Sequence, residues 1–311
     1  MTTCARAVRP TDLVALVSFD GRVFPNEAKT RERIGRTDSA PHPLERALEQ
    51  WFSFATGCHT WISIKGATLR GLVSARRRGT NSAWELDCVI NACEDDDSVC
   101  VSLLEQSLKE AGHCGVEKVF LRLSVDSQVL PLARRLGFIE YQREMLLAAS
   151  SPTTLSHSHE VLPPFRKALR SDAFSLFELY LASMPEAARR AEAATFSDWK
   201  ASQDRSWLVG RISQQVAHRD GQLVAWLRSA SNGDCVHFDL LVRPSEPSHE
   251  ALLDVALEHS AGKRVLTLVP KSSGHLSHAL LKRGFEAGPE YAALVKRTAV
   301  TATAPQLAPA V

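Results

Sequence analysis

Two stretches of the chain follow the same order of predicted elements. Each begins with a helix and continues through glycine-linked antiparallel strands, a central strand, a helix, a second strand, a short helix and a closing strand. This repeat predicts an α/β (α+β layered) fold of two similar domains, each with a mixed, mostly antiparallel sheet flanked by helices. The predicted elements are 11–24, 59–78, 84–90, 103–111, 116–125, 132–138 and 141–148, and then 171–184, 207–231, 236–242, 252–257, 263–270, 278–285 and 290–298.

The segment between the two copies has a different composition. It reads AASSPTTLSHSHEVLPP, is dense in Ser, Thr and Pro, and shows no helical or strand periodicity. Such a segment cannot bury enough apolar surface to offset its ordering entropy. We therefore predict an N-terminal domain at 1–147, a linker at 148–164, a C-terminal domain at 165–300 and a disordered tail at 301–311.

Charge and composition indicate the class of protein. The chain has 37 Lys and Arg against 35 Asp and Glu, a net charge of +2, which gives no reason to expect a nucleic-acid partner. No apolar run reaches the roughly 18–20 residues that span a bilayer, and the N-terminus lacks the apolar core of a signal peptide. The seven cysteines, an odd number without a C-x-x-C pair, favour free thiols over disulfides or zinc. We expect a cytoplasmic protein without a metal.

The openings and endings of the two copies resemble a known family. The copies open on Arg9, Pro10 and Asp12 and on Arg166, Ser171, Asp172 and Ala173, and their short helices end in Gly137–Phe138 and Gly284–Phe285. With the strand–turn–helix unit between them, these motifs resemble GNAT N-acetyltransferase domains, so the chain resembles a tandem GNAT protein over 6–147 and 165–298. The resemblance implies an acyl-CoA co-substrate, acetyl-CoA or another, and a small amine as acceptor.

The same resemblance implies where the cofactor would bind. In the family, acyl-CoA lies between the fourth and fifth strands, with its pyrophosphate on a glycine-rich loop that opens a helix. The first copy has Asp95–Cys100 there, preceded by Glu94, and the second has Pro244–His249, so both lack the glycines and the basic residue. Carboxylates repel phosphates, whereas the second copy keeps hydrogen-bond donors. We therefore expect any acyl-CoA in the C-terminal domain. The candidate cofactor-binding residues are Leu241, Val242, Arg243, Ser248 and His249.

Catalysis in the family uses a base on a strand and, often, a tyrosine acid four residues before the Gly-Phe ending. Ala133 and Leu280 occupy the tyrosine position, and neither can donate a proton. Candidate bases remain on the two central strands. The alternation of side chains along a strand places Glu85 and Asp87 on one face, and likewise His237 and Asp239. Asp87 and Asp239 coincide in the repeat, which a structural hydrogen bond also explains. The four candidate catalytic residues are Glu85, Asp87, His237 and Asp239.

Three further features remain, and the first two of them each have two interpretations. Arg76–Arg78 is either an anion clamp or the solvated end of a hairpin. Trp51 and Trp199 serve the core or wall an acceptor pocket. The segment Asn26–Pro43 is placed at an acceptor lid by the resemblance alone.

The leading hypothesis is an acyl-CoA-dependent N-acyltransferase that acts on an unknown small amine, with activity in the C-terminal domain. The alternative is a non-catalytic GNAT-fold protein that binds a ligand or forms a homodimer, because both cofactor loops are degenerate and fold alone does not establish function.

Overall fold

The computed structural model describes residues 4–20, 24–31, 34, 57–66, 68–93, 96–155, 162–203, 211–232, 235–258 and 262–299. The predicted tail at 301–311, Trp51, Glu94 and Asp95 lie outside the described residues, as does most of Asn26–Pro43. The strands are β1 (Cys4–Ala7), β2 (Cys58–Lys65), β3 (Thr68–Arg78), β4 (Thr80–Asn91), β5 (Lys118–Ser124), β6 (Ile139–Ala149), β7 (Phe165–Lys167), β8 (Arg211–Arg219), β9 (Gln222–Asn232), β10 (Cys235–Val242), β11 (Arg264–Pro270) and β12 (Glu286–Arg297).

The helices follow the order that the sequence predicts, and the mixed α/β fold class is confirmed. We call 4–149 the N-half and 165–297 the C-half. The α-helices are α1 (Leu13–Asp20), α3 (Asp97–His113), α4 (Val129–Arg135), α5 (Ala173–Ser183), α6 (Glu186–Glu192), α7 (Phe196–Gln203), α8 (His249–Glu258) and α9 (Gly274–Leu281), and the short 3-10 helices are η1 (Pro10–Asp12) and η2 (Arg170–Asp172).

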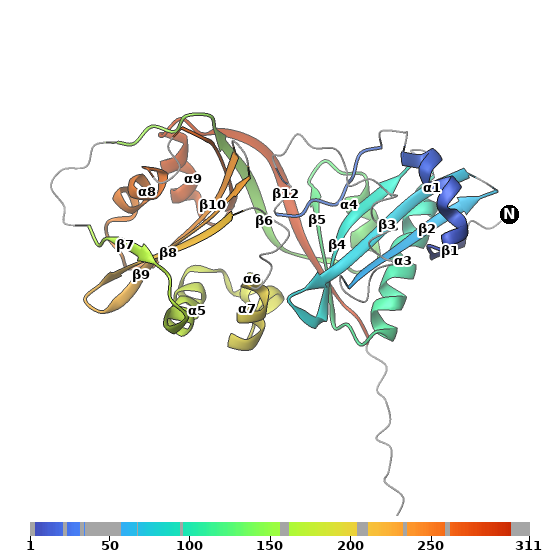
Figure 1. Cartoon of the computed structure of the whole chain (residues 1–311), viewed down its shortest axis with the longest axis horizontal. Helices are drawn as coiled ribbons and strands as arrows, with labels where there is room; N and C mark the ends of the chain where they lie inside the picture. Colours follow the sequence, from blue (N-terminus) through green and yellow to red (C-terminus); the bar gives the residue numbers. More distant parts are fainter. Residues whose placement is uncertain are drawn as a thin grey trace, which may run out of the picture.

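The described strands of both halves form one sheet, and the halves exchange their last strands. The strand order is β1-β2-β3-β4-β5-β12-β6-β11-β10-β9-β8-β7. The last strand of the C-half, β12, pairs antiparallel with β5 and β6 of the N-half, and β6 pairs antiparallel with β11. Figure 1 shows β12 and β6 side by side in the middle of the molecule. Each half therefore depends on a strand from the other.

Each half opens on the same ion pair, which explains why its first helix begins where it does. Arg6 donates two hydrogen bonds to the Asp12 carboxylate, at 2.6 and 2.7 Å, and Arg166 donates two to Asp172, both at 2.7 Å. Each carboxylate also accepts a backbone N–H three residues earlier. Arg6, and not the predicted Arg9, is thus the counterpart of Arg166.

The endings of the two short helices are also equivalent. Gly137 and Gly284 have φ of 82° and 83°, a left-handed conformation that favours glycine, and the predicted C-caps are confirmed. The following N–H groups of Phe138 and Phe285 return to the carbonyls of Ala133 and Leu280.

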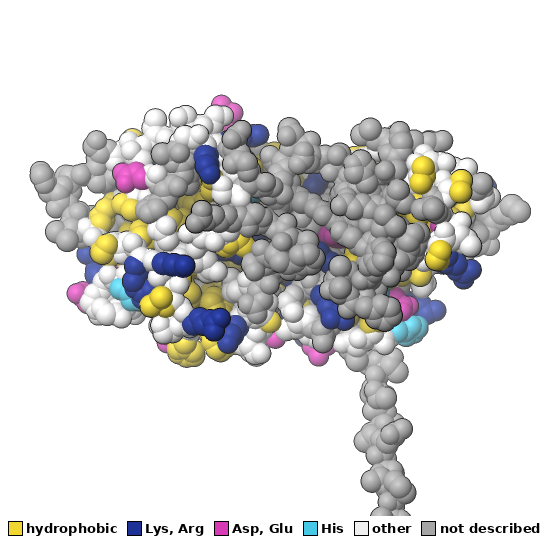
Figure 2. Space-filling view, viewed as in Figure 1, with side chains coloured by type: hydrophobic (Ala, Val, Ile, Leu, Met, Phe, Trp, Pro, Cys, Tyr) yellow, Lys and Arg dark blue, Asp and Glu magenta, His cyan; other side chains and the backbone are white. Residues whose placement is uncertain are grey.

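Helices cover both faces of the sheet. In the N-half, Leu16 of α1 packs with Ile62 and Leu72 on one face, and Leu103 of α3 packs with Trp61 on the other. In the C-half, α5 and α7 contribute to one cluster and α8 and α9 to another, and Figure 1 shows these two helix pairs on opposite sides of the strands. Basic and acidic side chains are interspersed on the face shown in Figure 2. No described helix is long and apolar enough to cross a membrane.

Two pairs of parallel strands separate after three residues. Strand β4 pairs with β5 only over Ala83–Glu85, and β10 pairs with β11 only over Cys235–His237. Beyond those points each half has a gap in its sheet, bordered by the first turn of α3 or α8. The two gaps lie at equivalent positions, and each is a candidate ligand-binding site.

Candidate functional site

The gap of the N-half is filled by the chain itself. We call Asn26–Lys29 the inserted segment. Asn26 donates to the Asp87 carbonyl at 3.0 Å and accepts from the Val89 N–H at 2.9 Å, which places it against β4. On the other side, the Lys29 N–H donates to the Arg122 carbonyl of β5 at 2.8 Å, and Ala28 forms a bridge with Leu123. The inserted segment therefore takes the place that a ligand would occupy between β4 and β5.

The space that remains in the N-half is acidic. A cavity of about 270 Å³, the N-half cavity, is lined by the carboxylates of Glu27, Asp97 and Asp126. Asp97 begins α3, where an acidic side chain stabilises the helix itself. Three carboxylates oppose the binding of a phosphate group.

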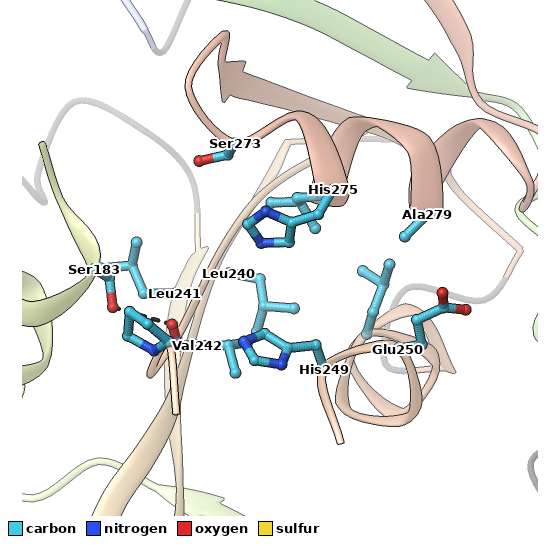
Figure 3. A pocket seen from close by; sticks show the side chains of 12 residues that line it. Ser183, Leu240, Leu241, Val242, His249, Glu250, Ser273, His275 and Ala279 are labelled. Carbon is cyan, nitrogen blue, oxygen red and sulfur yellow. Dashed lines mark hydrogen bonds between the residues drawn. The ribbon is translucent and has the colours of Figure 1, made fainter. Parts of the chain in front are cut away.

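The gap of the C-half is open. It forms a cavity of about 480 Å³, the C-half cavity, between the end of β10 and helices α8 and α9 (Figure 3). Two histidines face each other across it, with the rings of His249 and His275 5.9 Å apart and nearly perpendicular. The lining residues are Ser183, Leu240, Leu241, Val242, Pro244, His249, Glu250, Leu253, Ser273, His275, Leu276 and Ala279.

The two cavities occupy equivalent positions but differ in charge. Helix α3 begins at Asp97 and α8 at His249. Counted back from Gly137 and Gly284, Gln128 of the N-half corresponds to His275. Burial is the main cause that lowers the pKa of His249, and the neighbouring His275 is the second. An anion bound beside the ring would act in the opposite direction and favour its protonation. Of the two cavities, only the C-half cavity pairs an open gap with groups that tolerate an anion.

A further cavity of about 180 Å³, the central cavity, lies between the halves and adjoins the C-half cavity. The N-half contributes Arg31, Arg78, Glu85, Arg122 and Gln142. The C-half contributes a larger set that includes the aromatic Tyr180 and Trp226 and the charged Glu192, Arg228 and Asp239. The residues that line both cavities are Ser183, Leu240, Leu241, Ser273 and Leu276.

Arg31 links the two halves at this point. It lies two residues after the inserted segment, and it donates to Asp239 of β10 at 2.5 Å and to the Leu268 carbonyl of β11 at 3.3 Å. Its other nitrogen donates to Glu144 at 3.2 Å. The segment that fills the N-half gap thus also places a guanidinium between the diverging strands of the C-half.

The four predicted catalytic residues lie in different surroundings. Glu85 and Asp239 line the central cavity, and Glu85 accepts from Arg76 at 3.0 Å. Asp87 is fully buried and accepts from Ser74 at 2.7 Å, which is the structural hydrogen bond that the alternative predicted. His237 lies in the last pair of β10 with β11 and lines neither cavity.

The charge state of Asp239 limits its chemistry. Burial raises the pKa of its carboxyl, but the Arg31 and Arg228 guanidiniums outweigh burial and hold the pKa below its ordinary value. Asp239 is therefore ionised at neutral pH and is a weak proton acceptor.

The five predicted cofactor-binding residues separate into two groups. Leu241, Val242 and His249 line the C-half cavity. Arg243 instead donates to the Leu223 carbonyl at 3.2 Å, and Ser248 accepts from Arg219 at 3.1 Å and is buried. The last two thus support the turn before α8.

Two of the other sequence features are now resolved. The solvated-hairpin interpretation of Arg76–Arg78 fits only Arg77, which is exposed. Arg76 and Arg78 are only 15% and 12% exposed and pair with Glu85 and Glu192. Their burial follows from the contact of the hairpin with α7, where Gly79 lies close to Ala201. Trp199 lies in a hydrophobic cluster of the C-half with Trp226. No group of three metal-ligating side chains occurs within the described ranges.

Sequence reasoning missed Arg31, Tyr180, Trp226 and Arg228. Arg31 and the central cavity depend on contacts between halves, for which a single sequence carries no local pattern. Arg228 had a signal, because it is a charged residue that directly follows the apolar run LVAWL in its strand.

Comparison with known proteins identifies the fold. No family model matches this chain, and no curated protein sequence is similar to it. Among solved structures, a GCN5-related N-acetyltransferase from Sphaerobacter thermophilus matches at 14% identity, 94% coverage of this chain, 95% of that chain and a TM-score of 0.56. A tandem GNAT protein from the clavulanic acid biosynthesis pathway, whose structure was solved without AcCoA, matches at 12% identity, 97% and 100% coverage and a TM-score of 0.56. The chain therefore has the GNAT fold.

Proposed function

We propose that this protein is an acyl-CoA-dependent N-acyltransferase, with the acyl donor in the C-half cavity and a small amine in the central cavity. The observation that carries the proposal is that the open gap between β10 and β11 adjoins a polar cavity, with Leu240 and Leu241 in the wall of both. The GNAT fold, which this chain shares with N-acetyltransferases, supports an acyl-CoA as the donor. The inserted segment and the acidic N-half cavity argue against a second donor site.

The reaction requires few groups from the protein. The neutral amine nitrogen attacks the thioester carbonyl carbon, the carbon–sulfur bond breaks, and the proton that the nitrogen loses ends on the CoA sulfur. Arg31 lies between the diverging strands, where a guanidinium would stabilise the oxyanion that forms at the carbonyl oxygen. Asp239 in turn fixes the position of Arg31.

A second candidate, a non-catalytic ligand-binding protein, is favoured by the residues at the family's acid position. Ala133 and Leu280 are fully buried in the two hydrophobic cores and cannot donate a proton. The enzyme therefore depends on another donor or on solvent to protonate the CoA sulfur, whereas a binding protein needs none.

Titration with acetyl-CoA followed by thermal unfolding tests the donor site. At about 100 times its Kd, the ligand stabilises the fold by about 2.7 kcal/mol, which raises Tm by several degrees. Ala279→Phe fills the C-half cavity and should abolish the shift. Leu132→Phe, at the equivalent position of the N-half cavity, should keep it.

If Ala279→Phe does not fold, the double substitution of His249 and His275 by alanine takes its place and should likewise reduce or abolish the Tm shift. The absence of a Tm shift at millimolar acetyl-CoA would contradict the proposal. Release of free CoA thiol in the presence of an amine panel separates the enzyme from the binding protein, since a protein that shifts without releasing thiol is the second candidate.

A further inference from the structure

The central cavity contains buried polar atoms that have no partner in the described structure. Tyr180 Oη and Trp226 Nε1 can donate hydrogen bonds, and Gln142 Oε1 and Gln203 Oε1 can accept them. Tyr180 and Trp226 are each 6% exposed. Because a buried polar group without a partner is costly, four such atoms around one cavity indicate a polar occupant.

The charges around the cavity do not balance. Arg31, Arg76, Arg78 and Arg122 are each within hydrogen-bonding distance of a carboxylate, from the set Glu85, Glu144, Glu192 and Asp239. Arg228 lines the same cavity and, within the described part of the chain, makes no salt bridge. Among the described residues, the cavity is lined by four arginines and three carboxylates, so one positive charge is in excess: Arg31, Arg78, Arg122 and Arg228 against Glu85, Glu192 and Asp239. Arg228 is half-buried and lies opposite Asp239, to which Arg31 already donates a hydrogen bond at 2.5 Å.

Strand register locates this charge relative to the C-half cavity. Trp226 lies opposite Leu241, which lines both cavities, and Arg228 lies opposite Asp239. Arg228 is thus two residues further along β9, about 6 to 7 Å from the wall that the C-half cavity and the central cavity share. Trp226 and Arg228 point to the same face of the sheet, and Tyr180 packs in one cluster with Trp226.

We infer that the acceptor is a small amine that carries a carboxylate, bound through Arg228. This inference rests on the proposed function. The planar guanidinium matches a carboxylate in two parallel hydrogen bonds. Trp226 Nε1 and Tyr180 Oη supply further donors, while the nitrogen of the acceptor points to the wall at Leu241. A single surplus charge matches a carboxylate better than a phosphate, which carries about −1.5 to −2.

Binding in the absence of any acyl donor tests this inference separately from the proposed function. The probes are alanine, β-alanine, 4-aminobutanoate and 5-aminopentanoate, each beside its carboxamide, and phosphoethanolamine as the phosphate-bearing amine. Calorimetry on the wild-type protein should show at least one amino acid that binds about 10- to 100-fold more tightly than its carboxamide. Arg228→Gln should remove this preference, and Arg228→Lys should restore part of it because the charge returns without the planar fork.

Arg264→Gln is the matched control, because Arg264 is exposed at the start of β11 and lines neither cavity. Equal binding of every amino acid and its carboxamide, or no binding of any of them, overturns the inference. So does tighter binding of phosphoethanolamine than of every amino acid. If the preference is present but acetyl-CoA does not bind, the acceptor site stands and the proposed transferase fails. In the active enzyme, Arg228→Gln should raise KM for the amino acid with little change in KM for acetyl-CoA.

Discussion

Arg31 donates a hydrogen bond to Asp239 at 2.5 Å across a sequence separation of 208 residues. The two residues belong to different halves of the chain, and the contact lies where β10 and β11 diverge. The N-half therefore contributes a side chain to the open gap of the C-half, although its own gap is filled. One half thus has an open gap, and the other half contributes a side chain that borders it.

Replacing Arg31 by methionine tests this relationship. We expect kcat/KM to fall at least about tenfold, since the substitution removes the guanidinium that the proposed function assigns to stabilising the oxyanion. The free energy of unfolding at pH 7 should fall by about 1–3 kcal/mol, discounted because the Arg31 side chain is 36% exposed. Kinetics and urea denaturation measure the two effects, and Arg134→Met, which removes a surface ion pair, is the control.

The pH dependence of that loss has a definite sign. Arg31 helps to hold the pKa of Asp239 below its ordinary 3.8, so the stabilisation is present above that value and disappears as the pH falls through the lower folded-state pKa. The stability difference between wild type and Arg31→Met should therefore begin to shrink as the pH falls below about 4. A difference that stays constant down to pH 2 would show that Asp239 is not the partner concerned.

Asn26→Ala should destabilise the N-half. The substitution leaves the Val89 N–H and the Asp87 carbonyl without their partner in a buried site, at a cost of about 2–4 kcal/mol. Chemical denaturation measures this loss. Gln128→Ala removes an exposed amide that lines the N-half cavity and should cost almost nothing. Equal effects of the two variants would contradict the filling role of Asn26.

Removal of β12 should unfold more than the C-half. A chain truncated after Phe285 lacks the strand that lies between β5 and β6, so both strands of the N-half lose their common neighbour. We expect loss of cooperative unfolding together with association through the exposed edges, measured by circular dichroism and light scattering. Truncation after Ala299 leaves β12 intact and is the control. An N-half that stays protected from hydrogen exchange without β12 would refute the dependence.

Acetyl-CoA should bind more tightly as the pH falls from 8 to 6. Burial and the neighbouring His275 lower the pKa of His249, and a phosphate beside the ring would raise it again, so proton uptake accompanies binding. Below the pKa of the bound state, affinity rises by up to about tenfold per pH unit. Calorimetry at several pH values measures the slope. His249→Gln should flatten it, and an unchanged slope would place the anion elsewhere.

Tyr180→Phe should weaken acceptor binding without weakening the fold. Tyr180 Oη has no partner among the described residues, so its removal leaves the unfolding free energy unchanged or raises it by about 1 kcal/mol or more. Tyr141→Phe is the matched control, since the Tyr141 hydroxyl donates to Glu192 at 2.8 Å and its loss should cost about 1–3 kcal/mol. If both substitutions destabilise the protein equally, Tyr180 has a partner in solution.

The fold was predictable from sequence because its signals are local. Helical and strand periodicity, and the left-handed glycines Gly137 and Gly284, are written within a few residues of each element. The acidic first turn at Asp97 and the milder turn at His249 likewise lie within a few residues of their helices, and they predicted the difference in charge between the two halves at this place. These features require no knowledge of distant contacts.

The site was only partly predictable because its decisive contacts are not local. Glu85, Asp239, Leu241, Val242 and His249 line the C-half cavity or the central cavity, as expected of residues on the central strands and at the start of the helix that follows. By contrast, the insertion of Asn26–Lys29 between β4 and β5 and the exchange of β6 and β12 join residues that are far apart in the chain. Neither leaves a periodic pattern, and closing such long loops carries an entropic cost that only the complete sheet offsets.

The strand exchange has a consequence for synthesis of the protein. A ribosome releases the N-half long before it adds residues 286–297, yet β12 is the strand that pairs with β5. The nascent N-half thus waits with an unmated edge while the C-half is translated, at the stage when such edges associate most readily. Assembly of the whole sheet is therefore completed after translation of β12, and slow elongation through the second half would lengthen the period in which chaperones must shield the first.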